Sequence, residues 1–274
     1  MHFERGVCPA PLLELAAFAP VTRSLRLGTT SLLLPLHPPE ELAAQIAALD
    51  QISSGRALIG LGRGFQRRML EAFRVPPAEK RDRFDEALDR MLALWSDGHR
   101  KGDLFAPCQS PHPPLAVAAF GPKGLAQAAR RGLPYLASPV ETVAQIEQNQ
   151  RRHREGMPDP GPRPLAPVMR TVFVSESERE LESIRVRLAG ELTGRGVGLP
   201  EAVNAAIDSP LDARTLIGTP EMVTERLVQD RARLGIDLLI VRPQIAGIER
   251  VVLERSLGWL AETVWPAVVA RTTA

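Results

Sequence analysis

The stretch that decides the fold is Leu25–Phe65, which reads LRLGTTSLLLPLHPPEELAAQIAALDQISSGRALIGLGRGF. A mostly apolar run, a segment with helical periodicity and a second short apolar run follow one another, which is the strand–helix–strand pattern of a parallel sheet. Both apolar runs end in polar, glycine-containing turns. Because ligands bind at the carboxyl ends of parallel strands, we expect the active face at the ends of these two strands.

The rest of the chain continues to alternate strands with helices. Strands are expected at Leu25–Leu34, Ala57–Leu61, Leu115–Ala119, Pro134–Ala137, Val168–Val174 and Ile236–Val241. Strands that each feed a following helix are typical of a TIM-type (β/α)8 barrel, and about six of the eight are visible. We therefore expect an α/β fold of this type that is incomplete at its N-terminus, formed as one domain over residues 1–274 with an insertion at about 175–218.

Composition narrows the class of protein. The net charge of the 274 residues is +2, from 34 basic and 32 acidic side chains, so nothing favours nucleic acid as a partner. The chain has neither an 18-residue apolar run nor a signal peptide, which indicates a cytoplasmic protein with no membrane partner. Cys8 and Cys108 stand alone, so we expect no disulfide and no metal site.

Ordered motifs in the chain resemble those of the bacterial-luciferase-like flavin monooxygenases. They are a GT-x-x strand end, LP and HP, a helix closing on LDQ-x-S-x-GR, and G-x-G-R-G; CQSPHPPLAVAA, RRGLPYLAS and GTPEMVTERL follow in the family's order. In that family a strand, a helix and a second strand precede an E-H-H-F segment. This chain opens with Met1-His2-Phe3, so the resemblance implies a truncated start and makes His2 the catalytic candidate.

The resemblance also assigns roles to the two turns of the opening stretch. Thr30-Ser31 matches the family's non-prolyl cis peptide, which forms a bulge under the flavin ring. Arg63, beside Gly64, matches an arginine that binds the flavin phosphate, and a guanidinium fork suits phosphate oxygens. Taken without the resemblance, Thr30-Ser31 is an ordinary trans strand end and Arg63 pairs with a surface carboxylate.

A second phosphate contact is expected at Gly121-Pro122-Lys123-Gly124, between a strand and its helix. Free N–H groups at a helix N-terminus bind anions, and the Lys123 ammonium adds positive charge. The family commonly places Ser or Thr hydroxyls here, whereas this chain has glycines. The alternative is an ordinary tight turn.

The function that the resemblance implies is monooxygenation of a small organic substrate with reduced FMN and O₂. A separate flavin reductase and a homo- or hetero-dimer are the implied partners. Two alternatives remain: a hydride-transfer oxidoreductase that uses a deazaflavin, and a non-catalytic flavin-binding or partner subunit. The substrate itself is not indicated, because loop variation sets it in barrel enzymes.

Overall fold

A computed structural model describes residues 8, 10–64, 66–101, 106–158, 163–192, 201–243 and 245–272. The chain divides into two compact units, Met1–Ala118 and Ala119–Ala274, and each is described by itself. Within the described residues, no helix combines the length and the apolar character that crossing a membrane requires.

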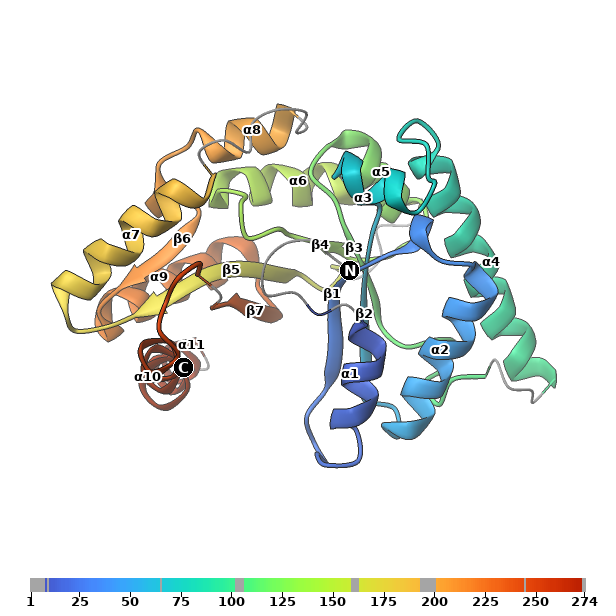
Figure 1. Ribbon diagram of the computed structural model, residues 1–274, viewed down its shortest axis with the longest axis horizontal. Coiled ribbons are helices and arrows are strands. Elements are labelled where there is room, and N and C mark those ends of the chain that lie inside the picture. The colour runs from blue at the N-terminus through green and yellow to red at the C-terminus, as the bar shows by residue number, and fades with distance from the viewer. Residues whose placement is uncertain are drawn as a thin grey trace. The chain divides into compact units, whose positions relative to one another are not determined.

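The first unit contains three parallel strands in the order β1-β2-β3. Helices α2 and α4 lie side by side next to these strands (Figure 1). The elements are α1 (Pro11–Phe18), β1 (Leu27–Leu33), η1 (Leu34–Leu36), α2 (Pro39–Ile52), β2 (Ala57–Gly62), α3 (Arg67–Ala72), α4 (Lys80–Lys101) and β3 (Leu115–Ala118). The opening stretch thus forms the predicted strand–helix–strand unit.

Helix α4 packs through the apolar stripe that its 3.6-residue periodicity predicts. Phe84, Leu88, Met91 and Trp95 are fully buried on it. The Trp95 indole N–H also donates to the carbonyl of Ala43 on α2, at 3.1 Å. This bond satisfies the polar atom of a buried side chain and fixes how the two helices pack.

The LDQ-x-S-x-GR motif holds loops in place around the strands. Asp50 is fully buried, and its two carboxylate oxygens accept hydrogen bonds from the backbone N–H of Gln109 at 2.8 Å and from its side-chain amide at 2.7 Å. Arg56 donates to the carbonyls of Ala19, Leu25 and Ser53. Both side chains therefore order the approaches to β1 and β3.

The second unit is built around β5, whose first half pairs in parallel with β7 and whose second half pairs in parallel with β6. The elements are β4 (Tyr135–Leu136), α5 (Pro122–Ala129), α6 (Val143–Glu155), β5 (Pro167–Val174), α7 (Glu178–Leu192), α8 (Glu201–Ile207), η2 (Leu211–Ala213), β6 (Thr215–Gly218), α9 (Pro220–Leu234), β7 (Leu238–Arg242), α10 (Arg250–Trp259), η3 (Leu260–Val264) and α11 (Trp265–Thr272). Ala137, directly after β4, forms a parallel bridge with Val168 of β5.

Strand β6 was not expected from the sequence. It lies in the segment predicted as an insertion, yet Thr215–Gly218 pairs with Thr171–Val174. The described residues therefore form seven strands rather than about six. A strand of four residues is too short to show a hydrophobic period, which is why the sequence pattern did not predict it. The single-domain organisation stays a prediction.

One face of β5 packs against helices. Val168 lies in a core cluster with residues of α5, α6 and α9, and Val172 and Val174 lie in a cluster with residues of α9 and α11. Arg170 lies between them on the same face because side chains alternate along a strand. It is completely buried, and with Asp230 of α9, 3.5 Å away, it places an ion pair among these apolar side chains.

Candidate active site

Strand β1 carries the predicted irregularity within its length. The peptide bond between Thr30 and Ser31 is cis, and the register with β2 shifts there, because Thr30 pairs with Gly60 and Leu32 pairs with Leu61. Ser31 is thus the extra residue of a β-bulge. The Thr29 hydroxyl donates to the Gly60 carbonyl at 3.1 Å beside it. The expected cis peptide and bulge are confirmed.

The bulge is fitted against the end of β2. A Cβ on Gly62 would collide with the Ser31 hydroxyl oxygen and lie 3.1 Å from Cδ2 of Leu33. Gly64 follows with a φ of +73°, a left-handed conformation that favours glycine. The two glycines of the G-x-G motif are therefore required for different reasons. Gly62 leaves room for the Ser31 hydroxyl, and Gly64 allows the left-handed turn.

Arg63 lies between these glycines and reaches the third strand. Its guanidinium donates to the carbonyl of Ala118, the last residue of β3, at 3.3 Å. The side chain is half-buried. Its position at the carboxyl ends of β2 and β3 is the edge at which parallel α/β folds bind ligands.

The surroundings of Arg63 are rich in positive charge. Burial, and next the charge of Arg81, lower the pKa of the Arg63 guanidinium to about 10, while Asp85 opposes the shift. Burial and the charges of Arg63 and Arg81 also lower the pKa of the Lys80 ammonium. In the sequence, the charged start of α4 is typical of a solvated helix face, and only folding places it beside Arg63. Three basic side chains around one edge favour an anion.

The predicted phosphate loop of the second unit lies at the start of α5. Gly121 is the N-cap residue, with an extended φ of −143° and no capping side chain. Its carbonyl accepts from the N–H groups of Gly124 and Leu125, and no atom lies within 4 Å of where its Cβ would be. Pro122 occupies the first turn, so Lys123 supplies the next backbone N–H. The loop has the predicted helix-start geometry, and its role stays a prediction.

Other candidates fall outside this site. His2 lies outside the described residues. Arg170 pairs with Asp230 at 3.5 Å and Arg242 with Glu191 at 3.0 Å. Across the described ranges, no group of three or more His, Cys, Asp or Glu is arranged to hold a metal ion.

Comparison with known proteins identifies the family of this chain. Residues 1–238 match the model of the luciferase-like monooxygenases. The chain is 27% identical over 257 residues to the oxygenase component of a flavin-dependent trigonelline monooxygenase of Acinetobacter baylyi, covering 85% of this chain and 71% of that protein.

Solved structures show the same fold. The monooxygenase RslO1 of Streptomyces bottropensis has a TM-score of 0.77 at 26% identity, covering 94% of this chain and 83% of that one. The oxygenating constituent of 3,6-diketocamphane monooxygenase of Pseudomonas putida, solved with FMN, has a TM-score of 0.75 at 20% identity over 94% and 84% of the two chains. The predicted barrel-class α/β fold and the resemblance are confirmed, and the chain belongs to the luciferase-like monooxygenases, a family of flavin-dependent oxidoreductases.

Proposed function

We propose that this chain binds reduced FMN and uses O₂ to oxygenate a small organic substrate. The observation that carries the proposal is the joint placement of the Thr30-Ser31 bulge and Arg63 at one strand edge of the first unit. The bulge offers backbone groups to a flat ring, and the guanidinium offers a fork to a phosphate. Both lie where a parallel α/β fold presents its ligand-binding loops.

The residues present fit a phosphorylated flavin. Burial, and next the repulsion among Arg63, Lys80 and Arg81, lower the pKa values of Arg63 and Lys80, while Asp85 opposes the shift at Arg63. A phosphate dianion placed there would offset that repulsion and accept charge-assisted hydrogen bonds from the guanidinium. Within the second unit, we assign a phosphate contact to the backbone N–H and the ammonium of Lys123, with the open space at Gly121 allowing close approach.

In this reaction the flavin supplies the electrons that activate O₂, and the protein supplies position and surroundings. Ser31 and Gly62 shape the surface against which the flavin ring packs. Arg63 fixes the distal end of the cofactor, which sets the lateral position of the ring. The loops beyond the strands exclude water and select the substrate. A separate flavin reductase would deliver the reduced cofactor, since the trigonelline relative is the oxygenase component of its system, and a dimer stays part of the proposal.

Cofactor identity tests the proposal directly. Purified protein is equilibrated anaerobically with reduced FMN or with a reduced deazaflavin, and binding is followed by absorbance and fluorescence before air is admitted. We expect tight binding of reduced FMN and O₂-dependent reoxidation that differs from that of the free cofactor. Preference for the deazaflavin without O₂ consumption would favour the hydride-transfer alternative. Binding of neither cofactor would leave the non-catalytic subunit.

A further inference from the structure

Arg214 is a buried arginine of the second unit whose charge is not balanced by a carboxylate. It directly follows η2, and it is only 6% exposed. Within the part of the chain that the structure describes, its guanidinium makes no hydrogen bond and no ion pair. Burial, and next the charge of Arg242, lower the pKa of the Arg214 guanidinium, and no described carboxylate opposes the shift. A buried charge without a partner is costly, so this position favours an anion.

Arg170, which is also buried in this unit, shows how the fold balances such a charge elsewhere. It pairs with Asp230 at 3.5 Å, and it donates to the carbonyls of Glu141 and Ala213. The carboxylates of Asp230 and Glu141 both favour its charged form. Among the described residues, the protein therefore provides partners for Arg170 and none for Arg214.

Arg214 adjoins a row of polar side chains on one face of the sheet. Thr171 of β5 pairs in register with Thr215 of β6 and with Arg242 of β7, so the three side chains share a face. Arg242 donates to the Thr171 hydroxyl at 3.3 Å and pairs with Glu191 of α7 at 3.0 Å. Because Glu191 balances Arg242, the net charge of +1 that remains belongs to Arg214, directly before Thr215.

The same face carries an apolar cluster beside this row. Phe173 and Ile217, two residues beyond Thr171 and Thr215, pack against α7, and Leu211 of η2 packs against their cluster. The Nε of Arg214 is closed to solvent, whereas its two Nη atoms, which form no bond either, remain open to it. A ligand therefore reaches the guanidinium end-on, at both Nη atoms.

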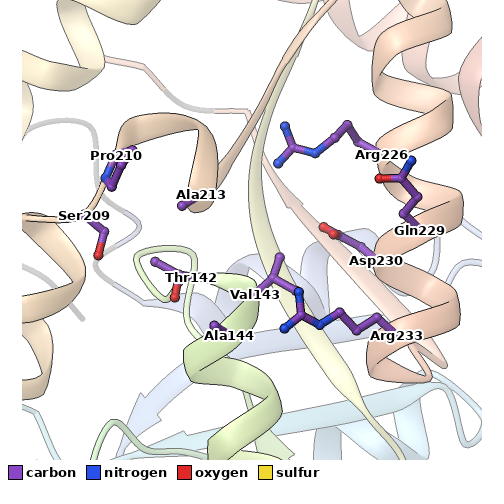
Figure 2. A pocket seen from close by; sticks show the side chains of 10 residues that line it. All are labelled: Thr142, Val143, Ala144, Ser209, Pro210, Ala213, Arg226, Gln229, Asp230 and Arg233. Atoms are coloured by element: carbon purple, nitrogen blue, oxygen red, sulfur yellow. The ribbon is translucent and has the colours of Figure 1, made fainter.

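The cavity of about 450 Å³ in the same unit is a different space. Figure 2 shows Ala213 at its wall, opposite Arg226 of α9. Arg214, the next residue along the chain, does not line it. The arginines of this cavity already have partners, because Arg226 donates to a backbone carbonyl and Arg233 donates to a carboxylate, each at 2.7 Å. The unbalanced charge thus lies outside this cavity.

We infer that Arg214 binds the carboxylate group of a small organic ligand. The two oxygens of a carboxylate lie in one plane and accept parallel hydrogen bonds from the two Nη atoms of a guanidinium. Its single negative charge matches the net charge of +1 at this position, and its organic part meets the apolar cluster beside the row. Binding at Arg214 goes beyond the proposed function and is measured without flavin, so the two can fail separately.

Acetate is the probe, because it is the carboxylate with the smallest apolar part. Its binding to the full chain is measured by saturation-transfer NMR, and its effect on the melting temperature is measured at constant ionic strength. Acetamide has the same shape without the charge, and sulfate is a dianion. We expect acetate to bind and to raise the melting temperature, acetamide to do neither, and sulfate to bind at least about tenfold more weakly than acetate.

Arg214→Met should weaken acetate binding at least about tenfold, because the charge-assisted hydrogen bonds are lost. It should also raise the melting temperature of the ligand-free protein, since an apolar side chain replaces an unpaired buried charge. Arg214→Lys keeps the charge and loses the fork, so it should also weaken acetate binding. Arg151→Met, which removes an exposed arginine of α6, is the matched control and should change neither quantity.

Three results would overturn the inference: no binding of acetate, sulfate that binds as tightly as acetate, or acetate affinity that is unchanged in Arg214→Met. A fall in melting temperature with unchanged acetate affinity in that variant would assign Arg214 to the fold alone. If Arg214→Met does not fold, Arg214→Lys decides, because unchanged acetate affinity there contradicts binding by the guanidinium fork.

Discussion

The Ser31 hydroxyl oxygen occupies the space into which a Cβ on Gly62 would project. The two residues belong to neighbouring parallel strands, and Ser31 is the extra residue of the β1 bulge. The contact explains why glycine is needed directly before Arg63: the bulge and the arginine are positioned by the same strand end. Disturbing this packing should therefore affect ligand binding at the bulge and at Arg63.

Gly62→Ala is expected to weaken flavin binding more than it weakens the fold. The added methyl group must displace Ser31 or the Leu33 side chain, whose Cδ2 would lie 3.1 Å from that methyl. Overpacking of this kind costs about 1–3 kcal/mol. We expect a measurable fall in melting temperature and a loss of FMN affinity, measured by quenching of flavin fluorescence.

Gly258→Ala is the matched control for that substitution. Gly258 lies within α10, and no atom lies within 4 Å of its Cβ position. Alanine in a helix should be neutral or should stabilise by about 0.5–1 kcal/mol. FMN affinity that is unchanged in Gly62→Ala would show that the Ser31–Gly62 contact does not support the flavin.

Asp50→Ala is expected to destabilise the first unit. Asp50 is fully buried, and it accepts from the backbone and the side chain of Gln109. Removing it leaves the half-buried N–H of Gln109 and the buried N–H of Ala57 without this acceptor, at a cost of about 1–3 kcal/mol. Urea unfolding measures the loss. Gln45→Ala, at an exposed position of α2, should change the free energy of unfolding by no more than about 0.5 kcal/mol, and equal effects of the two would contradict the assignment.

Deprotonation of the Glu141 carboxyl should make the free energy of unfolding fall as pH rises. Burial raises its pKa from 4.5 to about 7, although Tyr135, Ser138 and Asn149 all donate hydrogen bonds to it. Between these pKa values the unfolded chain has released the proton and the folded protein has kept it. The resulting stabilisation is full below pH 4.5 and is lost as pH rises to about 7. The loss is of the order of 3 kcal/mol.

The measurement is the free energy of unfolding of the wild type and of Glu141→Gln from about pH 4 to about pH 8, a range that spans both pKa values. Their difference isolates Glu141, because His153, whose burial lowers its pKa, titrates in both proteins. We expect the curve of the variant to be flatter on its alkaline side. Parallel curves would show that Glu141 titrates near its ordinary pKa in the folded protein.

Much of the fold could be predicted because long elements carry strong periodicity and clear end signals. A threonine followed by proline before a periodic segment is typical of a helix start, and Thr219 caps α9 (Pro220–Leu234) by accepting from the N–H of Met222. Gly55 follows α2 with a positive φ, which is typical of a glycine after a helix. The exception was β6, whose four residues show no period and pair only with the far half of β5.

The candidate site also contains residues that the sequence predicted and residues that it did not. Thr30-Ser31 and Arg63 were found because ordered motifs marked them; the bulge lies within β1, and Arg63 directly follows β2. Lys80 was missed because its charge looked like part of an exposed helix, and only folding brings it beside Arg63. The partner of Arg170 could not be predicted for a similar reason: Arg170 and Asp230 are 3.5 Å apart in space but far apart in the chain.

The affinities of FMN and riboflavin for the wild type and for Arg63→Gln test the central claim most directly. Riboflavin has the same ring and lacks the phosphate. If Arg63 binds the phosphate, the substitution removes a charge-assisted hydrogen bond of about 1.5–3 kcal/mol from FMN only. We predict that FMN affinity falls by roughly one to two orders of magnitude while riboflavin affinity is unchanged. An equal fall for both flavins, or no fall for FMN, would contradict the account.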